Sequence, residues 1–189
     1  MKKLGFAAIM GAGCILGYLL HYYVFCEMIT RFVPYNSVVY LPLLILSVLF
    51  CIAGVTAILM ILCYRRITKR LYITLLVIYG LLLILMLFGR STIERIFILN
   101  PLTSLREITD KEMLLQSVLN LCCFIPLGWT FRKLEKKKMV IAGIVMAFSL
   151  ELLQAVTMRG MFDTFDALLY IAGIGIGYSV LRRIDIKIV

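Results

Sequence analysis

Six long apolar stretches constrain this chain more than any other feature of its sequence. A helix that crosses a bilayer needs about 20 apolar residues, because the hydrocarbon core is about 30 Å thick. Hydrophobic residues make up 63% of the 189 residues, charged residues make up 16%, and no soluble domain is visible. We therefore predict an all-α polytopic transmembrane bundle of about six spans. The stretches are residues 4–26, 38–64, 71–88, 114–131, 139–158 and 167–181.

The basic residues predict the orientation of these spans. The net charge is +10, but Lys and Arg gather at the ends of the apolar stretches and form no single basic face, which argues against nucleic-acid binding. Most of them fall in residues 2–3, 65–70, 132–138 and 182–187. By the positive-inside rule, the N-terminus and the C-terminus are then both cytoplasmic. The connections that begin near His21, Gly89 and Arg159 face the outside.

The cysteines and the single histidine do not indicate a catalytic or metal site. All six cysteines lie in apolar stretches or at their edges, without metal-type spacing, so we expect packing residues, no metal and no cofactor. His21 stands beside Tyr22 and Tyr23, and we expect this group at headgroup depth, where amphipathic rings are favoured. An interfacial role is therefore favoured over a catalytic base.

The chain divides into three parts. Residues 1–88 form three helices without a recognised signature, 89–113 form a long outer connection, and 114–189 form three further helices. Within the connection, residues 96–99 are too apolar for a free loop and too short to span, so we expect an interfacial or re-entrant segment that ends before Pro101. Asp110 is the expected N-cap of the next helix.

A costly concentration of charge marks the fifth stretch and its exit. Glu151 and Gln154 lie inside the stretch, and an intramembrane carboxylate costs about 2.5–3.5 kcal/mol on insertion scales. Asn120, on the preceding helix, lies at the same depth, about 10 Å from the outer end, and is a candidate hydrogen-bond partner of Glu151. Arg159, Asp163 and Asp166 follow, and either aspartate is well placed to cap the last helix.

Proline and glycine predict where the helices meet. Pro126 weakens the fourth helix and predicts a kink, followed by Gly128, against which another helix packs. Gly173 and Gly177 are four residues apart, a spacing that brings helix backbones close together. Glycines of the first stretch predict close packing there as well.

The order of these elements resembles the VanZ-like family. The resemblance covers about residues 100–178, and Asn100-Pro101-Leu102 is similar to an Asn-Pro-Phe type element of that family. It implies a small multi-pass protein of the bacterial cytoplasmic membrane, whose named member is associated with resistance to the glycopeptide teicoplanin. The chain departs from the family at Tyr170, where an asparagine is usual. The matching residues are Asn120, 124–128 (FIPLG), 149–154 (SLELLQ), Arg159, Asp163, Asp166, Gly173 and Gly177.

Two functions from different classes follow from these residues. The first is a non-enzymatic envelope protein that reduces glycopeptide action through an outward-facing polar pocket. Its expected partners are membrane lipids and a lipid-linked cell-wall precursor, a glycopeptide or a membrane protein. The second is an intramembrane enzyme that modifies an envelope lipid or polymer. The pocket residues are Asn100, Asn120, Glu151, Gln154, Arg159, Asp163 and Asp166.

In the enzyme hypothesis, Glu151 works with Asp163 or Asp166 as acid and base, and Arg159 holds a phosphate or carboxylate. The same carboxylates are alternatively ligands for a hard divalent cation. A purely structural reading stays open beside both functions. In that reading Arg159 neutralises an aspartate, Glu151 pairs with Asn120, and the set only fixes the last three helices. A transporter is weaker, because no internal repeat and no paired broken helices are visible.

Overall fold

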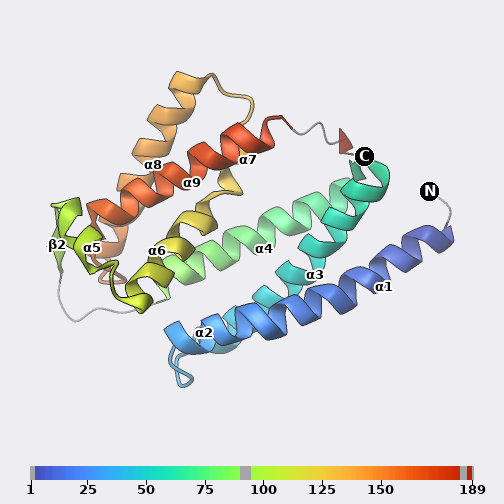
Figure 1. Cartoon of the computed structure of the whole chain (residues 1–189), viewed down its shortest axis with the longest axis horizontal. Coiled ribbons are helices and arrows are strands. Elements are labelled where there is room, and N and C mark those ends of the chain that lie inside the picture. The colour runs from blue at the N-terminus through green and yellow to red at the C-terminus, as the bar shows by residue number, and fades with distance from the viewer. Residues whose placement is uncertain (1–2, 90–94, 184–186, 189) are drawn as a thin grey trace. The chain divides into compact units, whose positions relative to one another are not determined.

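A computed structural model describes residues 3–89, 95–183 and 187–188 (Figure 1). Its chain is helical almost throughout and divides into two compact units. The first unit is Met1–Gly89 with Asp185–Val189, and the second is Arg90–Ile184. Of the outer connection expected at 89–113, residues 90–94 lie outside the described residues.

Three long apolar helical segments build the first unit. α1 (Lys3–Leu20) continues through the π-helical turn η1 (His21–Phe25) into α2 (Cys26–Phe32), and α3 (Tyr40–Tyr64) and α4 (Lys69–Phe88) follow. α1 packs along α3, and α3 packs along α4.

Glycines set the close approach of α1 to α3. A Cβ on Gly13 would overlap the hydroxyl of Thr56, and a Cβ on Gly17 would overlap the backbone of Ile52. Gly11 has nothing within 4 Å of such a Cβ. Close packing by glycines of the first helix is thus confirmed at Gly13 and Gly17.

His21 packs inside the first unit, beside α3. Its side chain is 6% exposed, and its Nδ1 lies 3.1 Å from the Oγ of Ser47 on α3. Tyr22 and Tyr23 remain exposed. A π turn adds a residue to one helical turn and so rotates the side chains around it. The ring of His21 is therefore buried against α3, a contact that the sequence did not indicate, and its position at headgroup depth stays a prediction.

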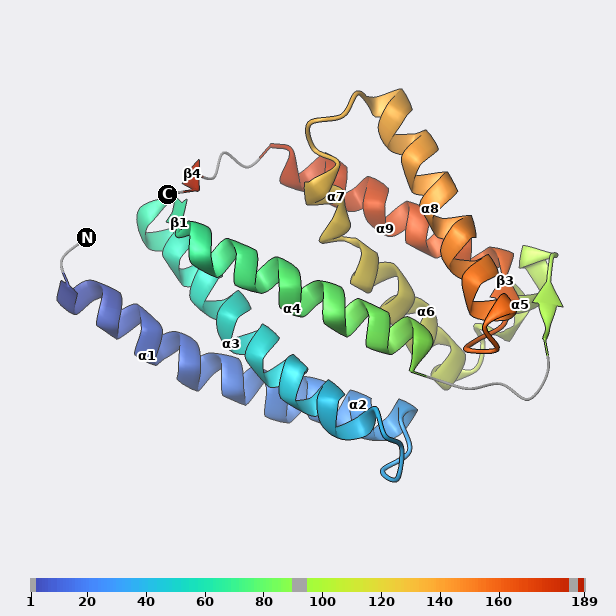
Figure 2. The same cartoon turned by 180° about the vertical axis from the view of Figure 1, so that it is seen from behind.

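In the second unit, α9 is the helix against which the others pack. The helices are α5 (Pro101–Glu107), α6 (Lys111–Phe124), α7 (Leu127–Thr130), α8 (Lys136–Val156) and α9 (Thr164–Leu181). α9 contacts α6, α7 and α8, as the two opposite views show (Figures 1 and 2). Asp110 is the N-cap residue of α6, although its side chain makes no capping hydrogen bond.

The break at Pro126 is confirmed, and α9 packs on it. α6 ends at Phe124 and α7 begins at Leu127. A Cβ on Gly177 would overlap the carbonyl oxygen of Ile125, and one on Gly128 would overlap the backbone at Tyr178. Gly173 is equally tight against the carbonyl oxygen of Leu121. These glycines let α9 approach the broken helix backbone to backbone.

Two short parallel ladders connect distant parts of the chain. β1 (Arg66–Ile67) pairs with β4 (Lys187–Ile188), and β2 (Phe97–Ile98) pairs with β3 (Phe162–Asp163). An even number of apolar helical segments separates the two strands of each ladder. Two parts of a chain that lie on the same side of a membrane must be separated by an even number of spans. The expected interfacial or re-entrant segment at residues 96–99 contains a strand, β2, that pairs with β3 directly before α9.

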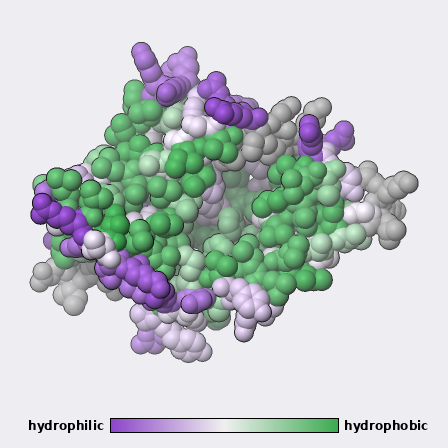
Figure 3. Space-filling view, in the orientation of Figure 1, coloured by the Kyte–Doolittle hydropathy of each residue, from purple (hydrophilic) through white to green (hydrophobic). Residues whose placement is uncertain are grey.

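The helices confirm an all-α, multi-pass membrane protein. Five helical segments are long and apolar enough to cross a membrane, and α9 is an additional apolar helix of shorter length. Apolar residues cover much of the surface in Figure 3, with hydrophilic residues towards its margins. The five segments are Gly5–Phe32, Tyr40–Tyr64, Lys69–Phe88, Lys111–Thr130 and Lys136–Val156.

Candidate functional site

Glu151 belongs to the face of α8 that packs on α9. Residues that recur every four positions are buried on this face, and Ala147 and Ala155, on either side of Glu151, are fully buried. Their small side chains bring α8 close to α9. Glu151 is 1% exposed, so its carboxyl group lies inside the protein.

The turn after α8 brings a backbone donor back to Glu151. Met158 adopts a left-handed conformation with φ of 54°, and the N–H of Arg159 donates to the carbonyl of Gln154 at 2.9 Å. The chain then returns, and the N–H of Asp163 donates to Glu151 Oε2 at 2.8 Å. Glu151 Oε1 is buried and has no hydrogen-bond partner among the described residues.

Both side-chain oxygens of Asp163 accept hydrogen bonds from the protein. Its Oδ1 accepts the N–H of Phe165 at 2.8 Å, which makes Asp163 the N-cap of α9. Its Oδ2 accepts the hydroxyl of Ser104 at 2.6 Å. Asp163 therefore joins α5 to the start of α9, and the expectation that an aspartate caps the last helix is confirmed for this residue.

Asn100 positions Ser104. The side-chain oxygen of Asn100 accepts the N–H of Leu102 at 3.1 Å and caps α5, with Pro101 in the first helical position, where a proline loses no hydrogen bond. Ser104 then lies one turn into the helix and is buried. The Asn-Pro-Leu element thus acts on the site through α5 and not by direct contact with Glu151.

Tyr170 completes the surroundings of Glu151. Its ring is 2% exposed and stacks on Phe124 with ring centroids 4.0 Å apart. Its hydroxyl is a hydrogen-bonding neighbour of the Glu151 carboxyl group, and the Asp166 carboxylate is an electrostatic neighbour. The position at which this chain departs from the VanZ-like pattern is therefore in the cluster. We call Ser104, Glu151, Asp163, Asp166 and Tyr170 the carboxylate cluster.

Three aromatic rings pack together beside the strand that ends at Asp163. Phe162, which precedes Asp163, has its ring centroid 5.7 Å from that of Phe97 on β2 and 6.3 Å from that of Phe148 on α8. A buried oxygen without a hydrogen-bond partner, such as Oε1 of Glu151, is costly.

Within the described residues, neither Asn120 nor Arg159 forms a hydrogen bond or an ion pair with the cluster. Asn120 lies on α6 and donates no hydrogen bond to Glu151, because equal depth does not fix the direction in which a side chain points. Arg159 is exposed and forms no ion pair with Asp163 or Asp166 within the described residues, so it does not neutralise an aspartate. Gln154 lies against the turn at Gly160.

The carboxylates are not arranged as metal ligands. Among the described residues, no three His, Cys, Asp or Glu side chains are grouped so that they could hold a metal ion. Asp163 also has both oxygens occupied by hydrogen bonds.

Sequence reasoning missed Ser104 and underestimated Tyr170. Ser104 lies 59 residues from Asp163 in the sequence, and the residues next to it in the sequence do not indicate a polar site. Tyr170 stands in an apolar helix, where an aromatic residue is ordinarily a packing residue. The departure from the family pattern was the available signal for Tyr170.

The fold and the site define a class: a multi-pass helical membrane protein with a buried carboxylate cluster where α8 meets the start of α9. A family model described as VanZ/LLP1 matches residues 71–185, which is more than half of the chain, and the chain belongs to this family. The match extends over the whole cluster and begins in α4, ahead of the motifs that first indicated the family. Comparisons with curated proteins and with solved structures found no match.

Proposed function

We propose that this protein acts in the bacterial cytoplasmic membrane and reduces the action of glycopeptide antibiotics of the teicoplanin type. The carboxylate cluster is its binding site. Membership of the VanZ/LLP1 family supports the proposal. The observation that carries it is Glu151 Oε1, a buried acceptor without a partner among the described residues.

The cluster selects a ligand that donates hydrogen bonds. Both oxygens of Asp163 and the Oε2 of Glu151 already accept bonds from the protein. A buried acceptor that lacks a partner costs about 1–3 kcal/mol, and more when it is charged. A hydroxyl or ammonium group would remove this cost. Sugars of a glycopeptide or of a lipid-linked precursor offer such groups.

The charge distribution supports an outward-facing cluster. The connection before α8, the first turn of α8 and the end of α9 together carry seven of the twelve Lys and Arg residues at 90–184, and by the positive-inside rule we expect this side in the cytoplasm. The α8–α9 turn then faces the outside, where a glycopeptide meets its target. Arg159, exposed in this turn, offers a cation to an anionic group of the same ligand.

Complementation of a deletion strain tests the function. Glu151→Gln keeps the size of the side chain and an oxygen that accepts the N–H of Asp163, but replaces the other oxygen with a donor. We expect folded protein at the wild-type level, increased glycopeptide susceptibility and altered drug binding at the cell surface. Glu135→Gln is the matched control, because Glu135 is an exposed residue before α8. Unchanged susceptibility and drug binding in the deletion strain would exclude the resistance role.

The orientation is tested separately by labelling single cysteines in a cysteine-free background. A cysteine at Arg159, which is exposed, should react with a membrane-impermeant thiol reagent added to intact cells. One at Lys136 should react only after the cells are opened. The reverse pattern would invert the topology and remove the outward-facing site.

A second candidate, an intramembrane enzyme acting on an envelope lipid, is favoured by one contact. The Tyr170 hydroxyl beside the Glu151 carboxyl group is the kind of proton donor and acceptor pair that general acid–base catalysis uses. Tyr170→Phe keeps the stack on Phe124 and removes only the hydroxyl. If the protein is an enzyme, Tyr170→Phe and Glu151→Gln should change membrane lipid composition, measured by mass spectrometry, without changing drug binding.

A further inference from the structure

Two arginines at the opposite ends of α8 and α9 from Glu151 are held against aromatic rings. The guanidinium carbon of Arg132 lies 3.5 Å from the centroid of the Trp129 ring. The guanidinium carbon of Arg182 lies 5.3 Å from the centroid of the Tyr178 ring. Cation–π contacts of this kind restrict a long, flexible side chain. Both guanidinium groups are thus ordered before any ligand arrives.

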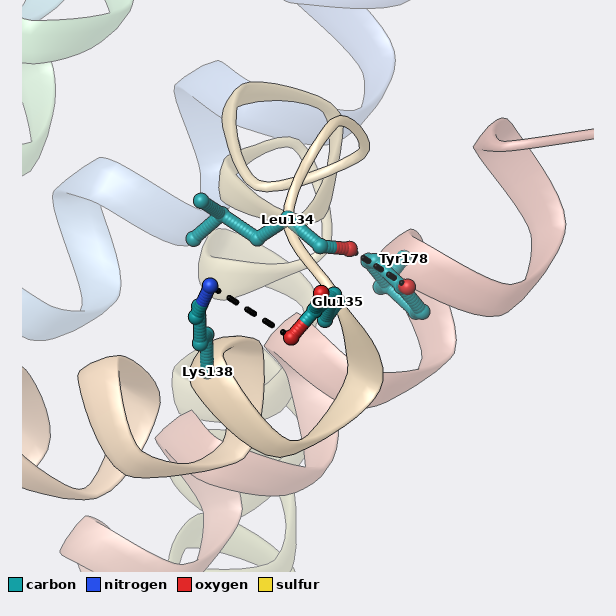
Figure 4. Close-up of polar contacts among 4 residues, drawn as sticks. All are labelled: Leu134, Glu135, Lys138 and Tyr178. Atoms are coloured by element: carbon teal, nitrogen blue, oxygen red, sulfur yellow. Dashed lines mark hydrogen bonds and ion pairs between the residues drawn. The ribbon is translucent and has the colours of Figure 1, made fainter.

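Tyr178 links Arg182 to the connection that carries Arg132. Its hydroxyl donates to the carbonyl oxygen of Leu134 at 2.9 Å, as Figure 4 shows, and accepts a hydrogen bond from Arg182 Nη1 at 2.5 Å. Leu134 belongs to residues 131–135, the connection between α7 and α8, which also carries Arg132. The C-terminal end of α9 and this connection therefore form one local structure, which we call the arginine site.

The arginine site has more hydrogen-bond donors than the acceptors around it satisfy. Arg132 Nη1 is buried without a hydrogen-bond partner among the described residues. The acidic residue of the connection, Glu135, pairs with Lys138 at 3.4 Å (Figure 4). Within the described part of the chain, neither Arg132 nor Arg182 forms an ion pair.

The start of α8 adds to the positive potential. The N-cap residue, Glu135, makes no side-chain hydrogen bond to the first turn, and the helix begins with the lysines at 136–138. The positive end of a helix dipole favours anions, and at this end one carboxylate, that of Glu135, stands beside three lysines.

We propose that the arginine site binds the phosphate group of an anionic phospholipid headgroup. The planar guanidinium fork matches phosphate in two hydrogen bonds, which an ammonium group cannot do in fixed geometry. Trp129 is of the residue type that concentrates at the boundary between lipid and water. Anionic lipids also concentrate beside basic segments of the cytoplasmic leaflet. The Arg132 group would then gain the acceptor that its buried nitrogen lacks.

The test uses the full chain, purified in a neutral detergent and unfolded by heat in the presence of short-chain lipids. Phosphatidylglycerol should raise the melting temperature of the wild-type protein. Phosphatidylcholine, whose headgroup carries no net charge, should not. Arg132→Gln and Arg182→Gln should each weaken the apparent affinity for phosphatidylglycerol about tenfold, the loss expected for a charge-assisted hydrogen bond.

Two control variants and one control anion make the result decisive. Lys133→Gln removes the same charge from an exposed residue of the same connection and should keep most of the affinity. Arg132→Lys keeps the charge but loses the planar fork and should behave like Arg132→Gln. Equal losses in Lys133→Gln and Arg132→Gln would overturn the site in favour of diffuse charge attraction. An equal rise with phosphatidylcholine would overturn an anionic headgroup as the ligand. An equal rise with inorganic phosphate alone would overturn a lipid as the source of the phosphate group.

Discussion

Replacing Gly177 with alanine tests whether α9 meets the break at Pro126 backbone to backbone. The added Cβ would overlap the carbonyl oxygen of Ile125 and lie 3.2 Å from the Cα of Gly128. Both atoms belong to the backbone, so no flexible side chain can move aside, and α9 must shift. Overpacking of this kind costs about 1–3 kcal/mol.

Gly175→Ala is the matched control, because it makes the same chemical change in the same helix. A Cβ on Gly175 has nothing within 4 Å. Both variants gain the intrinsic preference of alanine for a helix, about 1 kcal/mol. That gain cancels between them, so the difference in stability of about 1–3 kcal/mol reports the contact with the broken helix.

Thermal unfolding of the purified variants in detergent measures this difference. A loss of 1 kcal/mol lowers the melting temperature by about 2–4 °C for a chain of this size. We expect Gly177→Ala to unfold several degrees below Gly175→Ala, which should unfold at or above the wild-type temperature. Equal melting temperatures for the two variants would refute a backbone contact at Gly177.

Three further predictions follow from contacts at other places in the fold. Ser104→Ala removes the donor to Asp163 Oδ2 and should lower the free energy of unfolding by about 1–2 kcal/mol; unchanged stability would show that this bond does not hold α5 in place. Gly17→Val should loosen α1 from α3 and lower the melting temperature, whereas Gly11→Val, which points into open space, should not, and equal effects would contradict the glycine contact. Asn100→Ala removes the cap of α5 at a cost of about 1 kcal/mol, which should appear as faster hydrogen exchange at the first amides of α5 while those of α8 stay protected.

Features with a local physical cause could be predicted from the sequence. Pro126 removes a backbone donor wherever it stands, so the break between α6 and α7 needed no tertiary information. Asp163 precedes an apolar helix at capping distance, and Gly173 and Gly177 have the spacing of closely packed helices. The apolar stretches likewise determined the helices, because backbone groups in lipid must bond within their own segment.

Features that depend on helix rotation could not be predicted. Asn120 and Glu151 were matched by depth, but depth is only one coordinate of a side chain on a helix. The hydroxyl of Tyr170 and the N–H of Asp163 are beside Glu151 because of how α9 packs against α8. The depth of Asn120 on α6 says nothing about this packing. The π turn at His21 similarly changes the face on which the ring lies, and a period of 3.6 residues cannot show it.

The hydrogen bond from Asp163 to Glu151 also has a consequence for the order of assembly. Glu151 is synthesised 12 residues before the backbone group that satisfies it. α8 therefore enters the membrane with an unsatisfied carboxyl group, and the bond forms only after the turn at Met158 has brought the chain back. In the same way, β2 can pair only after β3 has been synthesised. The carboxylate cluster is thus a late product of membrane folding, and variants that slow the closing of the α8–α9 turn should prolong the period in which the protein is open to proteolysis.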